Sequence, residues 1–431
     1  MNAFTEVRLK FVSVEPLKYG ANAAAEFDDP DWPRFVRITD IDSNGKLREE
    51  TFRSLPREIA KPYLLQEGDV LLARSGATVG KSFIYEKQWG EACYAGYLIR
   101  LRVSKEFDAR YVYWCLQGSK YWSDIESNLI QSTIQNVSAE RYASFRVPSP
   151  PLEIQRRIAR FLDEKMTRID ALITKKRTLL DRLAEKRQAV ITHAATKGLN
   201  PDAPMKPSGI DWLGSIPAHW EIGNIRRFAQ MKTGHTPSRS VPEYWDNCTI
   251  PWFTLADVWQ LRDGTRWYLE ETEEKISEIG LANSAAELLP SGTVVFSRTA
   301  SVGYSGIMPE RMATSQDFWN WICGPKLTPE YLLLLFRSMT QKFEESTNGS
   351  THKTIYQGIA AGLEICVAPR EEQRAIAAYV FDLAPAIDAA ATKVRASIDQ
   401  LIEYRAALIT AAVTGKMRSE DARHEPALEG S

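Results

Sequence analysis

The hydrophobic positions of this chain follow a seven-residue repeat in two segments that lie half a chain apart. Apolar residues at this spacing, joined by a second apolar line on the same helix face, are typical of helices that pair as a coiled coil. Each helix could instead pack alone on its own globular domain. Because both stripes share one register, we expect two long helices that pair as an antiparallel coiled coil. The predicted helix-pairing residues are Leu162, Ile169, Ile173, Leu180, Leu183, Val190, Ile387, Val394, Ile398, Leu401 and Leu408.

The two segments are also copies of one another. QRRIARFLDEKMTRIDALI begins at Gln155 and QRAIAAYVFDLAPAIDAAA begins at Gln373, and the offset of 218 positions holds without a gap to the end of the segment. Matching helical segments half a chain apart indicate a tandem duplication. The apolar repeat is interrupted in the first copy, where Lys176 is aligned with Val394 of the second copy.

Each copy contains a signal for a helix boundary. Thr167 and Asp170 form a possible capping box, and the second copy has Pro385 in place of Thr167. Proline is comfortable at a helix start and costly inside a helix. We therefore expect a short helix that ends near Lys165, a break, and a long helix of roughly 30 residues, ~45 Å at 1.5 Å per residue.

The remaining segments alternate short apolar runs with turn residues. FVRITDI, GDVLLARSG and YLIRLRV in the first half are typical strands, and 109–128 has the spacing of one helix or a helix pair. The second half repeats several landmarks, with Arg298 matching Arg74 and Thr354-Ile355 matching Thr133-Ile134. We therefore predict an α+β fold with two pseudo-symmetric domains separated by the two long helical segments.

Proline-rich stretches and the helical repeats set the expected domain boundaries. The predicted order is a first globular domain at 1–150, a helical spacer at 151–199, a second globular domain at 200–368 with a proline-rich lead-in at 200–217, a second helical region at 369–417 and a disordered tail at 418–431.

Composition narrows the class of protein. The chain has 431 residues, 44% of them hydrophobic and 25% charged, and no apolar run reaches the roughly 18 residues of a membrane span. The N-terminus lacks the apolar core of a signal peptide, and the five cysteines form no CxxC pair. A reducing cytoplasm without membrane attachment is therefore expected.

Charge is informative only locally. The net charge of the whole chain is −1, whereas residues 151–200 carry 12 Lys and Arg against 6 Asp and Glu. This helical segment could lie along a polyanion, although a charged helix face is more often simply solvated.

Signatures of catalysis are missing from the sequence. GATVGKS at Gly76 resembles a phosphate-binding loop, but Ser75 stands where that motif needs its first glycine, and the second copy has Tyr304 in place of Lys81. The five histidines lie far apart, and no HExxH, GxSxG or amino-methyltransferase motif is present. The sequence therefore offers no candidate catalytic, cofactor-binding or metal-binding residue.

Polar, basic and aromatic residues recur in matching loops of both domains. Such side chains contact phosphates and base edges in nucleic-acid complexes, although a hairpin turn with exposed charges would look the same. The predicted DNA-binding residues are Arg74, Ser75, Thr78, Lys81, Gln131, Ser132, Thr133 and Gln135 in the first domain and Arg298, Thr299, Ser301, His352, Lys353, Thr354 and Tyr356 in the second.

With these features together, the chain resembles the specificity subunit of Type I restriction–modification systems (HsdS). The resemblance is carried by PLEIQRRIARFLDEKMTRIDALI with EKRQAVITHAATKGL, by PREEQRAIAAYVFDLAPAIDAAA with EYRAALITAAVTGKM, and by GIDWLGSIPAHWE at Gly209. It implies two target recognition domains, each reading one half of a bipartite asymmetric site in double-stranded DNA, held apart by the paired helices.

The resemblance also implies that this chain is not an enzyme and that it has catalytic partners. Two methyltransferase subunits would carry S-adenosylmethionine, and restriction subunits would use ATP and Mg²⁺. Exposed helix positions such as Arg156, Arg160 and Arg374 would dock the methyltransferase subunits. The alternatives are a coiled-coil protein-interaction scaffold without sequence-specific DNA reading, and the specificity half of a bifunctional restriction enzyme.

Overall fold

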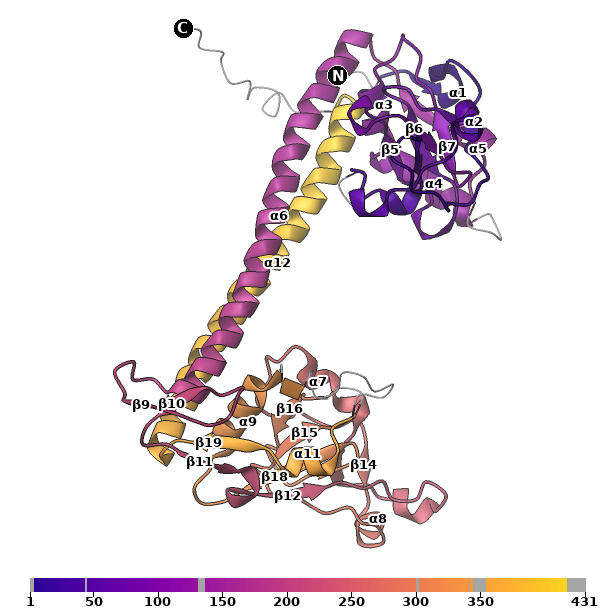
Figure 1. Cartoon of the computed structure of the whole chain (residues 1–431). Coiled ribbons are helices and arrows are strands. Elements are labelled where there is room, and N and C mark those ends of the chain that lie inside the picture. The colour runs from indigo at the N-terminus through magenta and orange to yellow at the C-terminus, as the bar shows by residue number, and fades with distance from the viewer. Residues whose placement is uncertain are drawn as a thin grey trace. The chain divides into compact units, whose positions relative to one another are not determined.

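The chain forms two compact units in a computed structural model (Figure 1). Unit 1 comprises Met1–Arg177 and Ala396–Ser431, and unit 2 comprises Thr178–Arg395. Each unit therefore contains one globular domain and one part of each long helix. The structure describes residues 4–42, 45–130, 136–299, 302–340, 342–343 and 354–416.

The globular domain of unit 1 mixes short strands with short helices, as the apolar runs predict. The expected helical stretch at 109–128 is a helix pair. The strands are β1 Glu6–Arg8, β2 Lys18–Tyr19, β3 Arg34–Val36, β4 Val70–Ala73, β5 Ser82–Ile84, β6 Ala92–Tyr94, β7 Leu98–Leu101 and β8 Arg146–Pro148; the helices are α1 Leu9–Val12, α2 Arg57–Ala60, α3 Ala109–Cys115, α4 Ser119–Ile130 and α5 Ala139–Ser144.

The globular domain of unit 2 has the same mixture of short elements after a hairpin formed by β9 and β10. The strands are β9 Met205–Pro207, β10 Ser215–Pro217, β11 Glu221–Asn224, β12 Ala229–Thr233, β13 Ile250–Phe253, β14 Lys275–Ile276, β15 Val294–Ser297, β16 Ser305–Ile307, β17 Ala313–Thr314, β18 Phe318–Cys323 and β19 Glu364–Val367; the helices are α7 Trp259–Arg262, α8 Glu278–Ala282, α9 Pro329–Ser338 and α11 Gln357–Ala361.

The sheets of the two domains have the same strand order. An antiparallel sheet runs β2-β7-β4-β5 in unit 1 and β12-β18-β15-β16 in unit 2. A parallel pair, β3-β6 or β13-β17, and an antiparallel pair, β1-β8 or β11-β19, complete each domain, and unit 2 adds β14 beside β13. The duplication inferred from the helices therefore extends to the globular domains.

Strand β4 in unit 1 and the equivalent β15 in unit 2 are covered on both faces, which explains why their sequences are almost continuously apolar. All four residues of β4 and all four of β15 are buried. Strands buried on both faces lose the alternation of apolar and polar residues that marks a half-exposed strand. The largest part of the core in unit 2 surrounds α9, whose segment from Tyr331 to Phe336 is fully buried.

Two long helices, α6 Leu152–Lys197 and α12 Arg370–Val413, run antiparallel and side by side (Figure 1). In unit 1 the guanidinium of Arg405 on α12 lies 3.2 Å from the carboxylate of Asp170 on α6. In unit 2 the partners exchange helices, and Arg187 on α6 lies 2.8 Å from Asp388 on α12. The two contacts are the same pair repeated by the duplication.

The expected helix break is wrong. α6 is continuous for 46 residues, and α12 is continuous for 44 residues with Pro385 in its interior. The hydroxyl of Thr167 donates to the carbonyl oxygen of Asp163 instead of capping a new helix, and Asp170 pairs with Arg405 instead of closing a capping box. Pro385 is exposed, so its ring faces away from the paired stripe.

Burial along the pair follows alternate steps of four and three residues. In unit 1 Leu162, Met166, Ile169 and Ile173 are buried on α6, and in unit 2 the equivalent Val380, Ala384, Ile387 and Ala391 are buried on α12. Steps of this kind keep one face of a helix turned toward a partner.

Among the described helices, α12 is the one that by length and composition alone could cross a membrane. The core helix of a protein without a membrane span passes the same test, and the apolar residues Ile376, Val380, Ile387, Ile398 and Leu408 of α12 are buried.

Replacing Pro385 by alanine should stabilise unit 2. Proline inside a helix removes one backbone hydrogen bond and costs up to about 3 kcal/mol relative to alanine. Because Pro385 is exposed, the substitution loses no buried contact. Thermal unfolding followed by circular dichroism should show a higher midpoint.

The matched control is Thr167→Ala at the equivalent position of α6, which should move the midpoint little because threonine is tolerated in a helix. An unchanged or lower midpoint for Pro385→Ala would contradict the expected cost of the proline.

Candidate nucleic-acid interface

The loops that carry Arg74 and Arg298 have the same backbone support in both domains. The N–H of Arg74 donates to the carbonyl oxygen of Tyr97 and its own carbonyl accepts from Val137, at 3.0 and 2.8 Å. Arg298 makes the equivalent bonds with Asp317 and Ile355 at the same two distances. The arginines therefore occupy one scaffold position, at the end of β4 in unit 1 and of β15 in unit 2.

Each arginine stacks on an aromatic ring, but the ring comes from a different strand in each domain. The guanidinium carbon of Arg74 lies 4.8 Å from the ring centre of Tyr19 on β2, and that of Arg298 lies 4.5 Å from Trp319 on β18. Tyr19 is paired across the sheet with Ile99, and Trp319 with Thr233. The aromatic residue has thus moved to the neighbouring strand while the stacking is kept.

The loop after β4 is a hairpin connection, because β4 and β5 are antiparallel neighbours. A phosphate-binding P-loop instead joins a strand to a helix. Gly80 and Gly303 both have positive φ, and both donate a 3.0 Å backbone hydrogen bond to the last residue of the preceding strand, Ala73 or Ser297. The glycines close this turn, and the arrangement gives no support to a nucleotide site.

The other described residues of the predicted interface lie around these arginines. Ser75 forms a β-bridge with Asn136, and Thr299 forms the equivalent bridge with Thr354. Lys81 is exposed and Thr78 is half-buried in the turn. Tyr356 has 68% of its surface exposed at the start of α11. Seven predicted residues lie outside the described part of the chain: Gln131, Ser132, Thr133, Gln135, Ser301, His352 and Lys353.

The bridges correct the sequence alignment of this region. Thr354-Ile355 occupies the position of Asn136-Val137, and not that of Thr133-Ile134. The backbone bonds to Arg74 and Arg298 fix this equivalence, whereas the short run of Thr and Ile matched by chance.

Sequence reasoning missed three residues beside the arginines. Asn136 accepts a hydrogen bond from Nε of Arg74 at 3.3 Å. Tyr97 has 69% of its surface exposed, and Asp317 occupies its position in the second domain. Their relation to the arginines comes from strand pairing, which no spacing in the sequence reveals.

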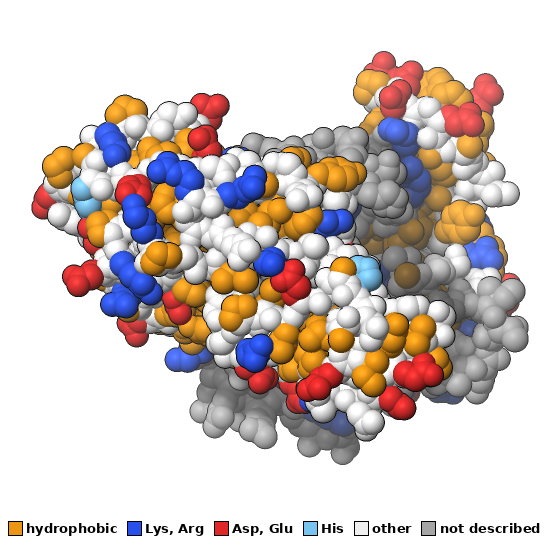
Figure 2. Space-filling model, turned by 90° about the horizontal axis from the view of Figure 1, so that it is seen from below, with side chains coloured by type: hydrophobic (Ala, Val, Ile, Leu, Met, Phe, Trp, Pro, Cys, Tyr) orange, Lys and Arg blue, Asp and Glu red, His pale blue; other side chains and the backbone are white. Residues whose placement is uncertain are grey.

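Basic side chains are not gathered in one continuous patch on the face shown in Figure 2, where Lys and Arg are interspersed with hydrophobic and acidic groups. Among the described residues, no group of three His, Cys, Asp or Glu side chains is arranged to hold a metal ion.

Each globular domain is attached to the beginning of one long helix by a buried glutamine. Gln155 near the start of α6 accepts from the backbone N–H of Asp108 at 2.9 Å, the residue that caps α3. Gln373 near the start of α12 accepts from the N–H of Thr328, the cap of α9, at 2.8 Å. Both glutamines are 1% exposed or less.

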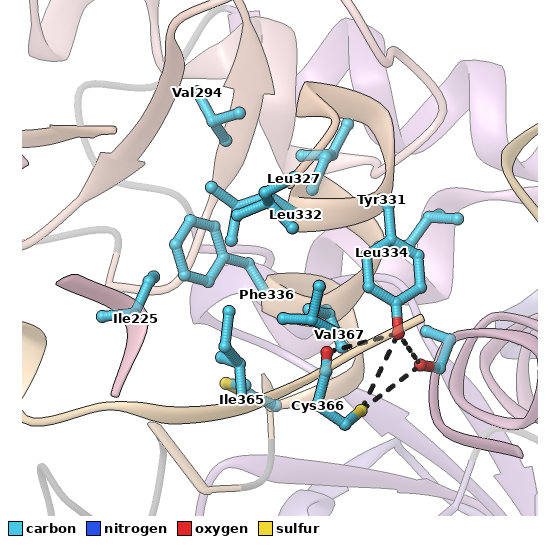
Figure 3. Packing of buried hydrophobic residues seen from close by; sticks show 14 of the residues in the cluster. Ile225, Val294, Leu327, Tyr331, Leu332, Leu334, Phe336, Ile365, Cys366 and Val367 are labelled. Carbon is cyan, nitrogen blue, oxygen red and sulfur yellow. Dashed lines mark hydrogen bonds between the residues drawn. The ribbon is translucent and has the colours of Figure 1, made fainter. Parts of the chain in front are cut away.

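A buried tyrosine attaches each domain to the end of the other helix. The hydroxyl of Tyr111 donates to the carbonyl oxygen of Val413 in α12 at 3.2 Å. The hydroxyl of Tyr331 donates to the carbonyl oxygen of Ala195 in α6 at 2.9 Å. Figure 3 shows the same hydroxyl beside Cys366. Burial raises the pKa of both phenols well above the ordinary value, so they remain hydrogen-bond donors near neutral pH.

Unit 2 has an additional junction built on Trp267. The guanidinium carbon of Arg337 lies 4.3 Å from the Trp267 ring centre, and the ring of Phe381 on α12 stacks on Trp267 with the two ring centres 4.4 Å apart. Arg187 and Arg337 both donate to the carbonyl oxygen of Gly264, each at 2.5 Å. Burial lowers the pKa of Arg337 to about 9, so its guanidinium stays protonated at neutral pH.

The predicted helix-pairing residues differ in how deeply their side chains are buried. Leu162, Ile169, Ile173, Ile387, Ile398 and Leu408 are buried, whereas Leu180, Leu183, Val190, Val394 and Leu401 are half-buried. The predicted docking residues Arg156, Arg160 and Arg374 are exposed, and Arg156 pairs with Glu153 at 2.8 Å.

Comparison with known proteins points to one family. The family model described as the Type I restriction modification DNA specificity domain matches residues 35–182 and 217–399, one copy in each half of the chain. The MjaIX specificity subunit of a Type I restriction enzyme from Methanocaldococcus jannaschii is 30% identical over 167 residues, 38% of each chain. The putative MjaX specificity subunit of the same organism is 23% identical over 84% of this chain and 81% of its own length.

Solved structures agree on the fold. The HsdS subunit from Thermoanaerobacter tengcongensis superposes with a TM-score of 0.56 at 17% identity, covering 96% of this chain and 97% of its own. A chain from a structure on assembly and conformational transition of the type I R-M system gives 0.72 at 16% identity, covering 97% and 99%. The sequence matches with MjaIX and with the MjaVIII specificity subunit of the same organism each cover 38% of the relative. The matched part of this chain therefore spans well under half the length of either relative.

Truncating the two equivalent arginines of the helix pair should have unequal effects. Arg405→Ala removes a partly exposed ion pair and should cost about 0.5 kcal/mol. Arg187→Ala also removes the bond to Gly264 and the contact with the Trp267 ring, whose centre lies 5.6 Å from the guanidinium carbon, and should cost about 2 kcal/mol. Urea unfolding followed by circular dichroism measures both losses. Equal losses would mean that the contacts of Arg187 with Gly264 and Trp267 contribute no stability.

Proposed function

This chain belongs to the family of Type I restriction–modification specificity subunits, and on that premise we propose that it reads a bipartite DNA site on behalf of a methyltransferase and a restriction endonuclease. Each globular domain contacts one half of the site, and the paired helices set the separation of the halves. The observation that carries the proposal is the repeated arginine loop, with its glycine turn and aromatic support, on two domains of the same strand order.

The chemistry of the arginine loops suits a DNA backbone. Arginine contacts phosphates and base edges, and a ring beneath the guanidinium holds its plane in one orientation. Close approach of the backbone at Gly76 is favoured by its open surroundings, where no atom lies within 4 Å of the place a side chain would take. These features support contacts that position the domain on DNA.

Two joined readers are needed because one small domain distinguishes only a few base pairs. Each mismatched pair costs roughly 1–3 kcal/mol, so discrimination against a genome requires many read positions. Linking the domains makes the second binding event intramolecular. Stiff paired helices favour one spacing between half-sites, which a flexible linker would not.

We propose a division of labour with partner subunits. The chain itself performs no catalysis; two methyltransferase subunits supply S-adenosylmethionine, and restriction subunits supply the ATP- and Mg²⁺-dependent steps. The exposed residues Arg156, Arg160 and Arg374 are proposed docking contacts, and the duplication supports two such contacts because Arg156 and Arg374 are equivalent. A cytoplasmic location follows from access to chromosomal and invading DNA.

Arg298→Ala and Arg74→Ala should each weaken DNA binding without changing the preferred sequence. Loss of one phosphate contact should reduce the salt dependence of binding, measured as the slope of log K against log salt, by about one unit. Binding is measured with the chain and its methyltransferase partner on a duplex that carries the site. Arg146→Ala, an exposed arginine on β8, serves as the control. Unchanged salt dependence in both variants would remove the arginine loops from the interface.

Lengthening both helices by one heptad should widen the gap between the half-sites. Seven residues add about 10.5 Å to a helix, or about 3 base pairs of DNA. The insertions belong between Leu172 and Leu183 of α6 and between Ala390 and Leu401 of α12, so that the pairing register is kept. Sequencing of methylated DNA reports the gap. A motif with its original gap would contradict the spacer role, and methylation by the chain without partners would favour a bifunctional enzyme.

A further inference from the structure

The two domains share some residues at the candidate interface and differ at others that occupy the same backbone position. Arg74 and Arg298 are shared, and so are the turn glycines Gly80 and Gly303. The residue whose carbonyl accepts from the arginine N–H differs, being Tyr97 in the first domain and Asp317 in the second. Contacts to phosphates carry no sequence information, whereas contacts to base edges do.

Shared residues therefore suit the contacts that every half-site offers, and residues that differ on a common scaffold suit base reading. We propose that Asp317 is a specificity-determining residue of the second domain, which selects a base with an exocyclic amine, cytosine or adenine, at one position of its half-site. This inference rests on the proposed function and concerns one residue of that interface.

The carboxylate of Asp317 is held in place from two sides. The hydroxyl of Thr299 donates to Oδ1 at 2.8 Å, and the hydroxyl of Ser315 donates to Oδ2 at 2.9 Å. Ser315 is buried, and Asp317 itself is half-buried. A carboxylate that is fixed in this way has lost its rotamer freedom before a ligand arrives, so little entropy is lost on binding.

Each carboxylate oxygen accepts one of these hydroxyl hydrogens and keeps a further lone pair, because an ionised carboxylate has about four acceptor sites. It offers no donor. Cytosine N4 and adenine N6 present an amine to the major groove, whereas guanine O6 and thymine O4 present acceptors. Asp317 therefore attracts the first two bases and repels the other two.

Arg298 is the basic residue that lies beside Asp317 in the sheet. Arg298 stacks on Trp319, and its backbone N–H rather than its guanidinium contacts Asp317. Nε of Arg298 is buried without a hydrogen-bond partner among the described residues. The first domain has the exposed phenol of Tyr97 at this place, which can both donate and accept, so the two domains present different chemistry to their half-sites.

The experiment compares the wild-type chain with Asp317→Asn and Asp317→Ala, each assembled with the methyltransferase partner. Binding is selected from a pool of duplexes randomised across both half-sites. The wild type should require cytosine or adenine at one position of the second half-site. In both variants the preference for cytosine or adenine over guanine or thymine at that position should fall about tenfold or more. The first half-site and the gap should not change.

Asp202→Asn, an exposed carboxylate in the lead-in to the second domain, is the matched control and should leave every position unchanged. Asparagine has the shape of aspartate and can still accept from Thr299, and an unchanged thermal midpoint confirms that the variant is folded. If the wild type selects a bipartite site and Asp317→Asn selects the same site with undiminished discrimination, the inference is wrong and the proposed function stands. Absence of any bipartite selection by the wild type would overturn the proposed function itself.

Discussion

The antiparallel pairing of α6 and α12 is the constraint on which the rest of the structure depends. Two copies of one helix that pair antiparallel bring the beginning of each beside the end of the other. Each globular domain is therefore held by two distant parts of the chain: a glutamine at a helix start, Gln155 or Gln373, and the end of the opposite helix, reached by Tyr111 or Tyr331. The ion pair repeated by the duplication, Asp170–Arg405 and Arg187–Asp388, forms in the same register in both units. A shift of one turn would leave these four charges without their partners.

Between the two copies, the interface loops have diverged more than the paired helices and the junction residues, because the two sets of residues are under different structural constraints. Helix positions in the pair must fit one another, and the junction residues must reach buried backbone groups, so both remain recognisable. Loop residues at the candidate interface face solvent and are free to change, provided that the turn itself is kept. The exchange of the aromatic support between Tyr19 and Trp319 illustrates this freedom, since the stacking is preserved on another strand. The Trp267 junction, by contrast, is described in unit 2. It packs a loop of the second domain against Arg187 of α6 and Phe381 of α12.

Local signals in the sequence were misleading where packing outweighs them. Thr167, Asp170 and Pro385 carry the chemistry of a helix start, yet both helices continue through these positions. The long apolar stripe stabilises the helix over many turns, which exceeds the cost of one proline on the exposed face. The alignment of Thr133 with Thr354 failed for a related reason. A match of two common residues has little weight beside backbone hydrogen bonds, and these place Asn136 opposite Thr354.

The sequence by itself determined the duplication, the α+β character of both halves, the long helices with their pairing stripe, and the arginine loops, because these depend on periodicity and on direct repetition along the chain. Only the tertiary structure decided which residues surround each arginine and which carbonyl groups receive the buried glutamines and tyrosines. Those neighbours come from strands and helices tens to hundreds of residues away, and their positions follow from sheet register and helix packing. Tyr97 and Asp317 share no residue type and no local motif, and their equivalence exists only in the folded chain.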